Sequence, residues 1–233
     1  MPLYSKRDMK KSRLVGVMFS LIVGLYNQAS FSKAIFIDQT DDTVVHRLGE
    51  VVNQRPEFFQ QNGWNTFRVE FENGNTYFLA SSLMYRNNPN YTGHGYPGGR
   101  GWCEFDFFDS NYRYVNGIRV NIRDHNDTNV CNWIYGVSAV TYKGQPTLLT
   151  AVQYHRGIDP AKTMDQIGTN FHRFTALLVL TPHPDGSLSI RQDDSCLGPM
   201  NQIAELAVAK KRVAECNRVA SNLKDDLKSE VQH

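Results

Sequence analysis

The stretch Thr43–Trp64, TVVHRLGEVVNQRPEFFQQNGW, is the part of the sequence around which we organise the rest of the chain. Its first residues are rich in β-branched side chains, which favours a short strand that ends at Arg47. Pro56 suits the first position of a helix, because proline lacks the N–H that would have no partner there. Gly63 is typical of the residue that closes a helix. We therefore predict a strand up to Arg47 and a compact helix over Pro56–Asn62.

Arg47 is the first candidate binding residue. Its planar guanidinium carries five donors and suits a phosphate or a carboxylate, so Arg47 is a candidate anion clamp. The alternative is an ordinary surface or salt-bridged arginine, and the neighbouring residues alone do not decide between the two.

Residues 1–34 predict a secretory signal peptide. Lysines and arginines precede the apolar run Leu14–Leu25, which is too short to span a bilayer comfortably, and Ser32-Lys33-Ala34 offers a cleavage point after Ala34, with Ala29 as the second candidate. Residues 1–34 contain six Lys or Arg and one Asp, so their removal changes the formal net charge from +2 to −3. We expect a secreted or periplasmic protein with no integral membrane segment in the mature chain and no nucleic-acid partner.

All four cysteines follow the predicted leader, and an even number in an exported chain favours two disulfides. They are Cys103, Cys131, Cys196 and Cys216, and their spacing leaves three pairings open. No pair has the C-x-x-C spacing of a zinc or thioredoxin-like site, and the oxygen-rich stretch 124–129 is more typical of a turn. We expect no metal.

The core sequence predicts short strands and minor helices in one α+β domain over residues 35–198. Turn residues indicate two hairpins, one around Asn73-Gly74 and one around Pro184-Asp185-Gly186. The apolar run Trp133–Val140 predicts a central, buried strand. Tyr112–Val115 predicts a strand that breaks at Asn116-Gly117 and resumes over Ile118–Ile122. The irregular loop 86–103 predicts a functional or partner surface.

Residues 199–233 predict a C-terminal amphipathic helix, because after Pro199 the chain contains no further proline or glycine. A narrow apolar seam repeats at spacings of three and four residues along it: Leu206, Ala209, Val213, Cys216, Ala220, Leu223 and Leu227. The helix either packs on its own domain or docks into a partner subunit.

Several stretches, read in order, resemble the enzymatic subunit of pertussis toxin and its relatives, the typhoid and cholera-type A subunits. TVVHR resembles the strand with the family's NAD-binding arginine, and RPEFFQQNGW resembles the segment that follows it. The sequence between Asn87 and Cys103 resembles the N-N…H…G-R-S-C stretch, WIYGVSAV is similar to the Y-I-Y-x-V strand, and HRGIDPAKTM resembles the run after the catalytic glutamate. The resemblance covers residues 43–192, with the hairpin at 65–85 as an insertion.

The resemblance implies an ADP-ribosyltransferase-like fold and a mono-ADP-ribosyltransferase that uses NAD as a substrate. It assigns Arg47 to NAD binding and His94 to the catalytic site. It places the family's Ser-Thr-Ser on Asn116-Gly117-Ile118 and the catalytic glutamate on Ala151, neither of which fits. A methyl group cannot stabilise the positive charge that develops when the nicotinamide bond breaks.

The resemblance also implies a Cys103–Cys196 disulfide and a delivery partner of the B-subunit type bound through the 199–230 helix. Glu104, Asp106 and Asp109 are the nearest acidic residues that could replace the missing glutamate.

We hold two main hypotheses. The first is a secreted toxin A-subunit-like protein with impaired or absent catalysis. The second is a non-catalytic exported subunit for binding or assembly, acting through the 86–103 loop and the C-terminal helix. An unrelated exported β-rich binding protein is a third reading.

Overall fold

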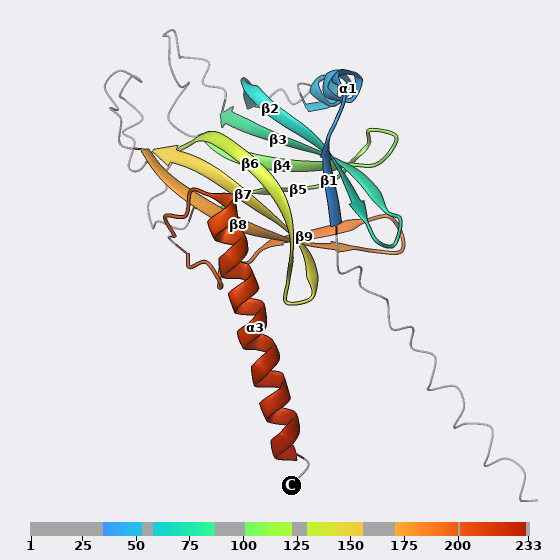
Figure 1. The fold of residues 1–233 in the computed structure, drawn as a ribbon. Coiled ribbons are helices and arrows are strands. Elements are labelled where there is room, and N and C mark those ends of the chain that lie inside the picture. Colours follow the sequence, from blue (N-terminus) through green and yellow to red (C-terminus); the bar gives the residue numbers. More distant parts are fainter. Residues whose placement is uncertain are drawn as a thin grey trace, which may run out of the picture. The chain divides into compact units, whose positions relative to one another are not determined.

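Two antiparallel sheets form most of the structure, a computed structural model that describes residues 35–52, 58–86, 101–122, 130–155, 171–199 and 201–231. Each sheet is a meander in which strands adjacent in sequence are adjacent in space (Figure 1). Sheet A contains β1 (Ile35–Gln39), β2 (Phe58–Phe71), β3 (Thr76–Arg86), β4 (Gly101–Phe108) and β5 (Tyr114–Arg119). Sheet B contains β6 (Val130–Tyr142), β7 (Gln145–His155), β8 (Phe171–Pro182) and β9 (Leu188–Gln192).

The main core lies between the two sheets. Because side chains alternate across a strand, every second residue points to this inner face. Leu79 and Phe105 from sheet A and Leu178 from sheet B are fully buried members of the same core cluster. The next residue along each strand points to an outer face, and each outer face has a covering helix.

The two sheets are joined along one edge by side-chain hydrogen bonds between β5 and β9. The Asn116 amide donates to the Leu188 carbonyl at 2.6 Å. The Asn121 backbone N–H donates to Oε1 of Gln192 at 2.8 Å, and the Gln192 amide donates back to the Asn121 carbonyl at 2.9 Å. These bonds satisfy polar groups at the ends of strands that would otherwise be open to pairing with another chain.

Helix α1 (Asp42–Val52) covers the outer face of sheet A. Asp41 caps it, because its carboxylate accepts a hydrogen bond from the Val44 N–H at 3.0 Å. Val44, Leu48 and Val52 lie one helical turn apart and are buried, and they share a cluster with Ala80 of β3 and other residues of sheet A.

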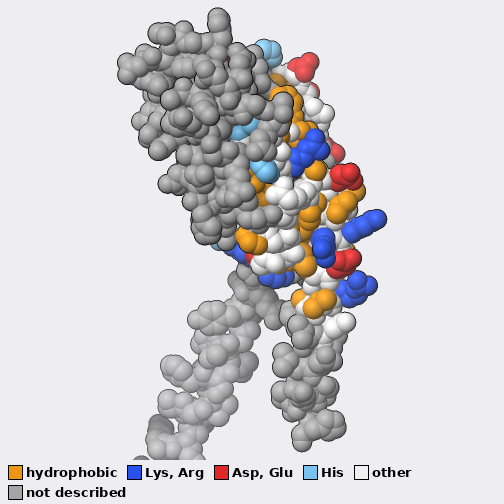
Figure 2. All heavy atoms as spheres, turned by 90° about the vertical axis from the view of Figure 1, so that its left-hand side faces the viewer, with side chains coloured by type: hydrophobic (Ala, Val, Ile, Leu, Met, Phe, Trp, Pro, Cys, Tyr) orange, Lys and Arg blue, Asp and Glu red, His pale blue; other side chains and the backbone are white. Residues whose placement is uncertain are grey.

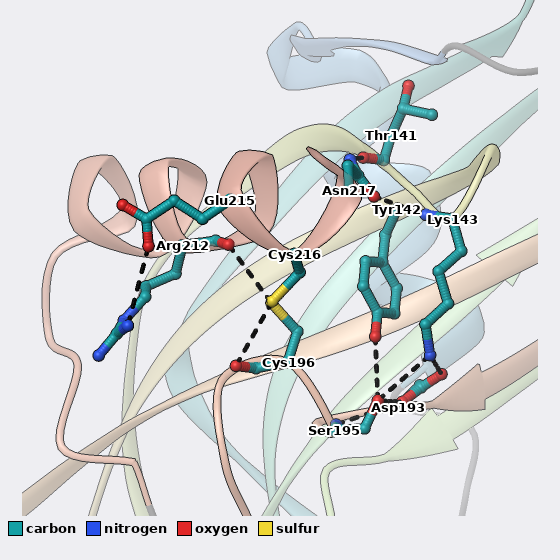
Figure 3. The surroundings of a disulfide bond; sticks show 10 residues. All are labelled: Thr141, Tyr142, Lys143, Asp193, Ser195, Cys196, Arg212, Glu215, Cys216 and Asn217. Atoms are coloured by element: carbon teal, nitrogen blue, oxygen red, sulfur yellow. Dashed lines mark hydrogen bonds and ion pairs between the residues drawn. A yellow bond between two sulfur atoms is a disulfide. The ribbon is translucent and has the colours of Figure 1, made fainter. Parts of the chain in front are cut away.

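Helix α3 (Leu206–Val231) covers part of the outer face of sheet B, and all described residues belong to one compact unit. Ala209 and Val213 are buried against sheet B. The Asn217 amide then donates to the Thr141 carbonyl at 2.8 Å, and its oxygen accepts from the Lys143 N–H at 2.9 Å (Figure 3). Beyond these contacts α3 runs past the sheet (Figure 1). Within the described ranges, neither helix is long and apolar enough to cross a bilayer.

The disulfides are Cys103–Cys131 and Cys196–Cys216, so the expectation of two bonds is confirmed and the pairing Cys103–Cys196 is wrong. Cys103 and Cys131 both belong to the core between the sheets, where their bond ties β4 to β6. Cys196 packs on the opposite side of sheet B, where it is bonded to Cys216 of α3 (Figure 3). Sheet B therefore separates the two cysteines that the resemblance would join.

The predicted order of strand and helix at the start of the chain is reversed in the structure. The predicted strand that ends at Arg47 is helix α1, and the described part of the predicted helix, residues 58–62, begins strand β2. Phe58 pairs with Arg86 and Phe59 with Tyr85, so pairing with β3 overrides the local helix signals. Gly63 lies where the register of β2 and β3 shifts, between Gln61 and Asn65. Glycine is common at such irregularities within strands.

Two further predictions for strands need correction, whereas the coarse α+β class and both hairpins agree with the structure. The strand Trp133–Val140 is not central, because β6 is the first strand of sheet B and Trp133 is 48% exposed. β5 is continuous through Asn116 and Gly117, since both residues pair with β4, and it ends at Arg119. The C-terminal helix begins at Leu206, after a segment without regular secondary structure.

Asp193 links the end of β9 to the β6–β7 turn (Figure 3). Its carboxylate accepts from Arg191 at 2.9 Å, lies 3.7 Å from the Lys143 ammonium and accepts from the Ser195 hydroxyl at 2.6 Å. Partial burial is the largest single influence and raises the pKa of Asp193. The hydrogen bonds from the Ser195 side chain, Arg191 and the Ser195 N–H, with the charge of Lys143, together lower that pKa to about 2.

We predict that Asp193→Asn lowers the free energy of unfolding by about 1–2 kcal/mol at pH 7. The folded pKa lies below the unfolded value of about 3.9, so the ionised carboxylate stabilises the fold above that pH. This contribution is lost as the pH falls towards the folded pKa of about 2. Urea unfolding from pH 7 to pH 2 measures it, with Asp38→Asn, an exposed carboxylate on β1, as the control. A difference between wild type and Asp193→Asn that is the same at every pH would contradict the prediction.

Candidate functional site

Arg47, the predicted anion clamp, lies on the exposed side of α1. Its guanidinium carbon is 5.3 Å from the centre of the Tyr112 ring, a distance at which a cation is attracted to the ring face. Arg47 therefore stands over the outer side of sheet A, next to the β4–β5 connection.

Asn116-Gly117-Ile118, the stretch that the resemblance aligns with Ser-Thr-Ser, lies on β5 with three separate structural roles. Asn116 holds β9 through its bond to the Leu188 carbonyl, and Ile118 packs against the core between the sheets. Gly117 faces outward, and a Cβ there would lie only 2.4 Å from Oδ1 of Asp106. The position therefore has no room for a side chain.

Ala151, at the position of the family's glutamate, is 1% exposed in the middle of sheet B. It pairs with Gly136 of β6 and Thr175 of β8. It alternates with the core residue Val152 and lies on the same side as Leu149, which packs in the cluster under α3. Ala151 thus belongs to the outer face of sheet B, whereas Arg47 lies on the helix that covers the outer face of sheet A. Face-to-face sheets are about 10 Å apart, so both sheets separate these residues.

The structure therefore does not bring Arg47, residues 116–118 and Ala151 into one site. His94 and most of the 86–103 loop lie outside the described residues, which resume at Gly101.

The three replacement acids lie near one another in sequence, but their environments differ. Asp109 is in the β4–β5 turn, where it accepts from Arg113 at 2.9 Å. Glu104 and Asp106 lie on the outer face of sheet A, opposite Arg119 and Gly117 respectively. Glu104 accepts the indole N–H of Trp102 at 2.6 Å.

The outer face of sheet A is polar around these two acids. Asp106 is fully buried, and so is Ser82, whose cross-strand partner is Glu104. The guanidinium carbon of Arg119 lies 3.8 Å from the centre of the Trp102 ring. The guanidinium, the indole and the Glu104 carboxylate thus hold one another in place. Glu104 serves here as a structural acceptor.

A second group of side chains, which the sequence analysis did not identify as a site, lies on the outer face of sheet B beyond α3. We call it the aromatic–arginine surface, and it consists of Trp133, Tyr135, Gln153, Phe171 and Arg173. Trp133, Tyr135 and Phe171 are 48%, 46% and 41% exposed. Figure 2 views the molecule from the side where β7 ends and β8 begins, and the described part of this face shows hydrophobic side chains among histidine, basic and acidic side chains.

The sequence indicates this surface through pairs of residues spaced two apart, which point to the same face of a strand. Trp133 and Tyr135 are two residues apart, and so are Phe171 and Arg173. We interpreted the first pair as part of a buried run. Their exposure follows from the position of β6 at the edge of sheet B, which no local pattern fixes.

Comparison of the chain with protein-family models, curated proteins and solved structures gives no significant match in any of the three.

We predict that Gly117→Ala lowers the free energy of unfolding by about 1–3 kcal/mol, because the added methyl group must displace the buried Asp106 side chain. Gly136→Ala is the matched control, since the new Cβ would lie 3.4 Å from Leu206 Cδ1, an ordinary contact distance. Both glycines lie within strands, so the loss of backbone freedom is comparable. Equal stability of the two variants in urea unfolding would show that Asp106 does not restrict position 117.

Proposed function

We propose that this protein is an exported, non-catalytic subunit that binds a partner protein through the C-terminal part of α3. The observation that carries the proposal is the division of α3 into two parts. The first part packs on sheet B and is joined to the domain by Cys196–Cys216, while the helix continues past the sheet.

The described contacts between α3 and sheet B lie in the first part of the helix. Ala209 and Val213 are buried, and Asn217 forms hydrogen bonds with Thr141 and Lys143 at the β6–β7 turn. Val219 is 59% exposed. In the sequence, the apolar seam continues beyond this point at Leu223 and Leu227. A seam that extends past its own domain suits a groove or helix of another subunit.

Export is supported by the two disulfides, because disulfides persist mainly in oxidising compartments. The predicted signal peptide at residues 1–34 agrees with that location.

A non-catalytic role is supported by the separation of the residues that the toxin resemblance selects. Cleavage of the nicotinamide–ribose bond needs an anchored dinucleotide and an anionic group at the developing positive charge. Arg47 and Ala151 lie on opposite sides of the two sheets, and Ala151 carries no charge.

We predict that NAD is not cleaved. The oxidised mature protein should release no nicotinamide above the background rate. NAD should not raise the melting temperature of either the wild type or Arg47→Lys. Thermal unfolding with and without NAD measures the melting temperature, and nicotinamide release is followed in a parallel sample. Release of nicotinamide that Arg47→Lys abolishes would establish an enzyme and refute this part of the proposal.

We predict that the double substitution Leu223→Asp and Leu227→Asp weakens partner binding at least about 100-fold, because two charges would have to be buried at the interface. The melting temperature should stay close to that of the wild type, since both positions come after Val213 and Asn217, which contact sheet B. Ser221→Asp with Ser229→Asp is the matched control, because it adds the same charge on the opposite side of the helix.

A photoreactive residue at position 231 in the native cells identifies the partner, and titration of that purified partner gives the affinities. Two results would contradict the proposal. One is that the wild type, the Leu223→Asp and Leu227→Asp variant and the control variant all bind the partner with the same affinity. The other is the absence of any defined cross-linked partner.

A further inference from the structure

We propose that the aromatic–arginine surface is a binding site for an acidic saccharide, a pyranose unit or short oligosaccharide that carries a carboxylate or a phosphate. This site lies on sheet B outside the part covered by α3, and the proposal does not depend on the partner of that helix.

Three of the side chains form a straight line across the sheet. Trp133 pairs with Gln153, and Gln153 pairs with Arg173, so the three residues face the same side of adjacent strands. Adjacent strands are about 4.8 Å apart, which places the Cα atoms of Trp133 and Arg173 about 10 Å from each other. The indole, the amide and the guanidinium are thus presented in order along one extended contact line.

Tyr135 is held in place by this line. Its hydroxyl donates to Oε1 of Gln153 at 2.5 Å, and the guanidinium carbon of Arg173 lies 4.7 Å from the ring centre. Fixing a side chain before a ligand arrives reduces the entropy that binding would cost. The surface is therefore partly organised in the absence of ligand.

Phe171 extends the surface by two residues along β8. It pairs with His155, and their ring centres are 4.2 Å apart. His155 is buried, and this burial lowers its pKa, so the imidazole beneath Phe171 is neutral at pH 7. Phe171 and Trp133 are exposed rings on either side of the polar groups of Gln153 and Arg173.

This combination of groups suits a saccharide. One face of a pyranose ring presents C–H groups, which pack on an aromatic ring, and its hydroxyls form hydrogen bonds with planar amides and guanidinium groups. A site for a small ligand typically combines apolar rings with a few placed polar groups. A protein interface of standard size has about 20–30 residues on each side, so this surface is small for one.

The acidic substituent is inferred from Arg173. In the part of the chain that the structure describes, no carboxylate forms an ion pair with Arg173, and its guanidinium lies over the face of the Tyr135 ring. A guanidinium whose face lies on a ring can still form a bidentate bond through its edge to a carboxylate or phosphate. The mature chain has a formal net charge of −3, so this cation does not belong to the broad basic surface that nucleic acids require.

The site has a boundary on the side of α3. The next line of residues, Gly136, Ala151 and Thr175, has small side chains and lies under the segment that leads into α3. The Thr175 hydroxyl donates to the Ile203 carbonyl at 2.6 Å, and a Cβ at Gly136 would touch Leu206. The chain before α3 therefore forms a wall beside the polar line.

The test is titration of the full mature protein with three ligands. They are an oligogalacturonide, glucose 6-phosphate and a neutral oligosaccharide of the same length as the oligogalacturonide. Calorimetry gives the dissociation constants. We compare the wild type with Trp133→Ala and Arg173→Gln. The controls are Phe36→Ala, a 62% exposed ring on β1, and Arg68→Gln on β2.

We expect at least one acidic saccharide to bind at least about tenfold more tightly than the neutral one. This is the gain in affinity expected from one charge-assisted hydrogen bond between Arg173 and the acidic group. The tighter of the two acidic ligands identifies the anion. Trp133→Ala should weaken binding about tenfold or more, and Arg173→Gln should remove the preference for the acidic ligand. The two controls should bind as the wild type does. The proposal is overturned if neither acidic saccharide binds, or if binding is unchanged in Trp133→Ala or Arg173→Gln. It is also overturned if the neutral oligosaccharide binds equally well.

Discussion

Burial of apolar side chains between the two sheets is the constraint on which the rest of this structure depends. Leu79, Phe105 and Leu178 are fully buried there, and each strand contributes its alternate residues to the same layer. Removing apolar surface from water contributes about 25 cal/mol per Å², and this layer contains the largest core cluster of the described residues. Once these residues face inward, the period of two fixes which residues face outward. The covering of the outer faces by α1 and α3 then follows, because both faces carry apolar side chains of their own.

Turn chemistry made the hairpins predictable, whereas long-range pairing decided the first third of the chain. Gly74 and Gly186 have positive φ values of 85° and 83°, which glycine adopts without strain, so the turns are encoded locally. The swap between α1 and β2 has a different cause. Val44, Leu48 and Val52 have helical spacing behind the cap at Asp41, and this pattern outweighs the β-branched residues among them. Proline and glycine near Phe58 are typical of helix ends, but residues 58–61 pair with β3, which supplies their backbone partners.

The candidate site was less predictable than the fold because order along a sequence does not report which face of a sheet a residue occupies. A register shift of one residue moves a side chain from one face to the other. Cys103 and Cys196 illustrate this, since each follows the resemblance in order, yet one lies in the inner core and the other beneath α3. The same holds for Arg47 and Ala151. Conversely, Trp133 and Tyr135 looked like core residues, and only the edge position of β6 makes them accessible.

The outer face of sheet B therefore divides into two regions with different physical character, and small side chains mark the division. Gly136, Ala151 and Thr175 allow the chain before α3 to approach the sheet closely. On one side of this line, Leu149 and Leu177 are covered by α3, and the disulfide to Cys216 holds the helix there. On the other side, large rings alternate with an amide and a guanidinium and remain exposed. Side chains larger than alanine at Gly136 or Ala151 would push the segment away and weaken both the packing of α3 and the wall of the exposed region. One row of small residues thus separates the part of sheet B that α3 covers from the aromatic–arginine surface.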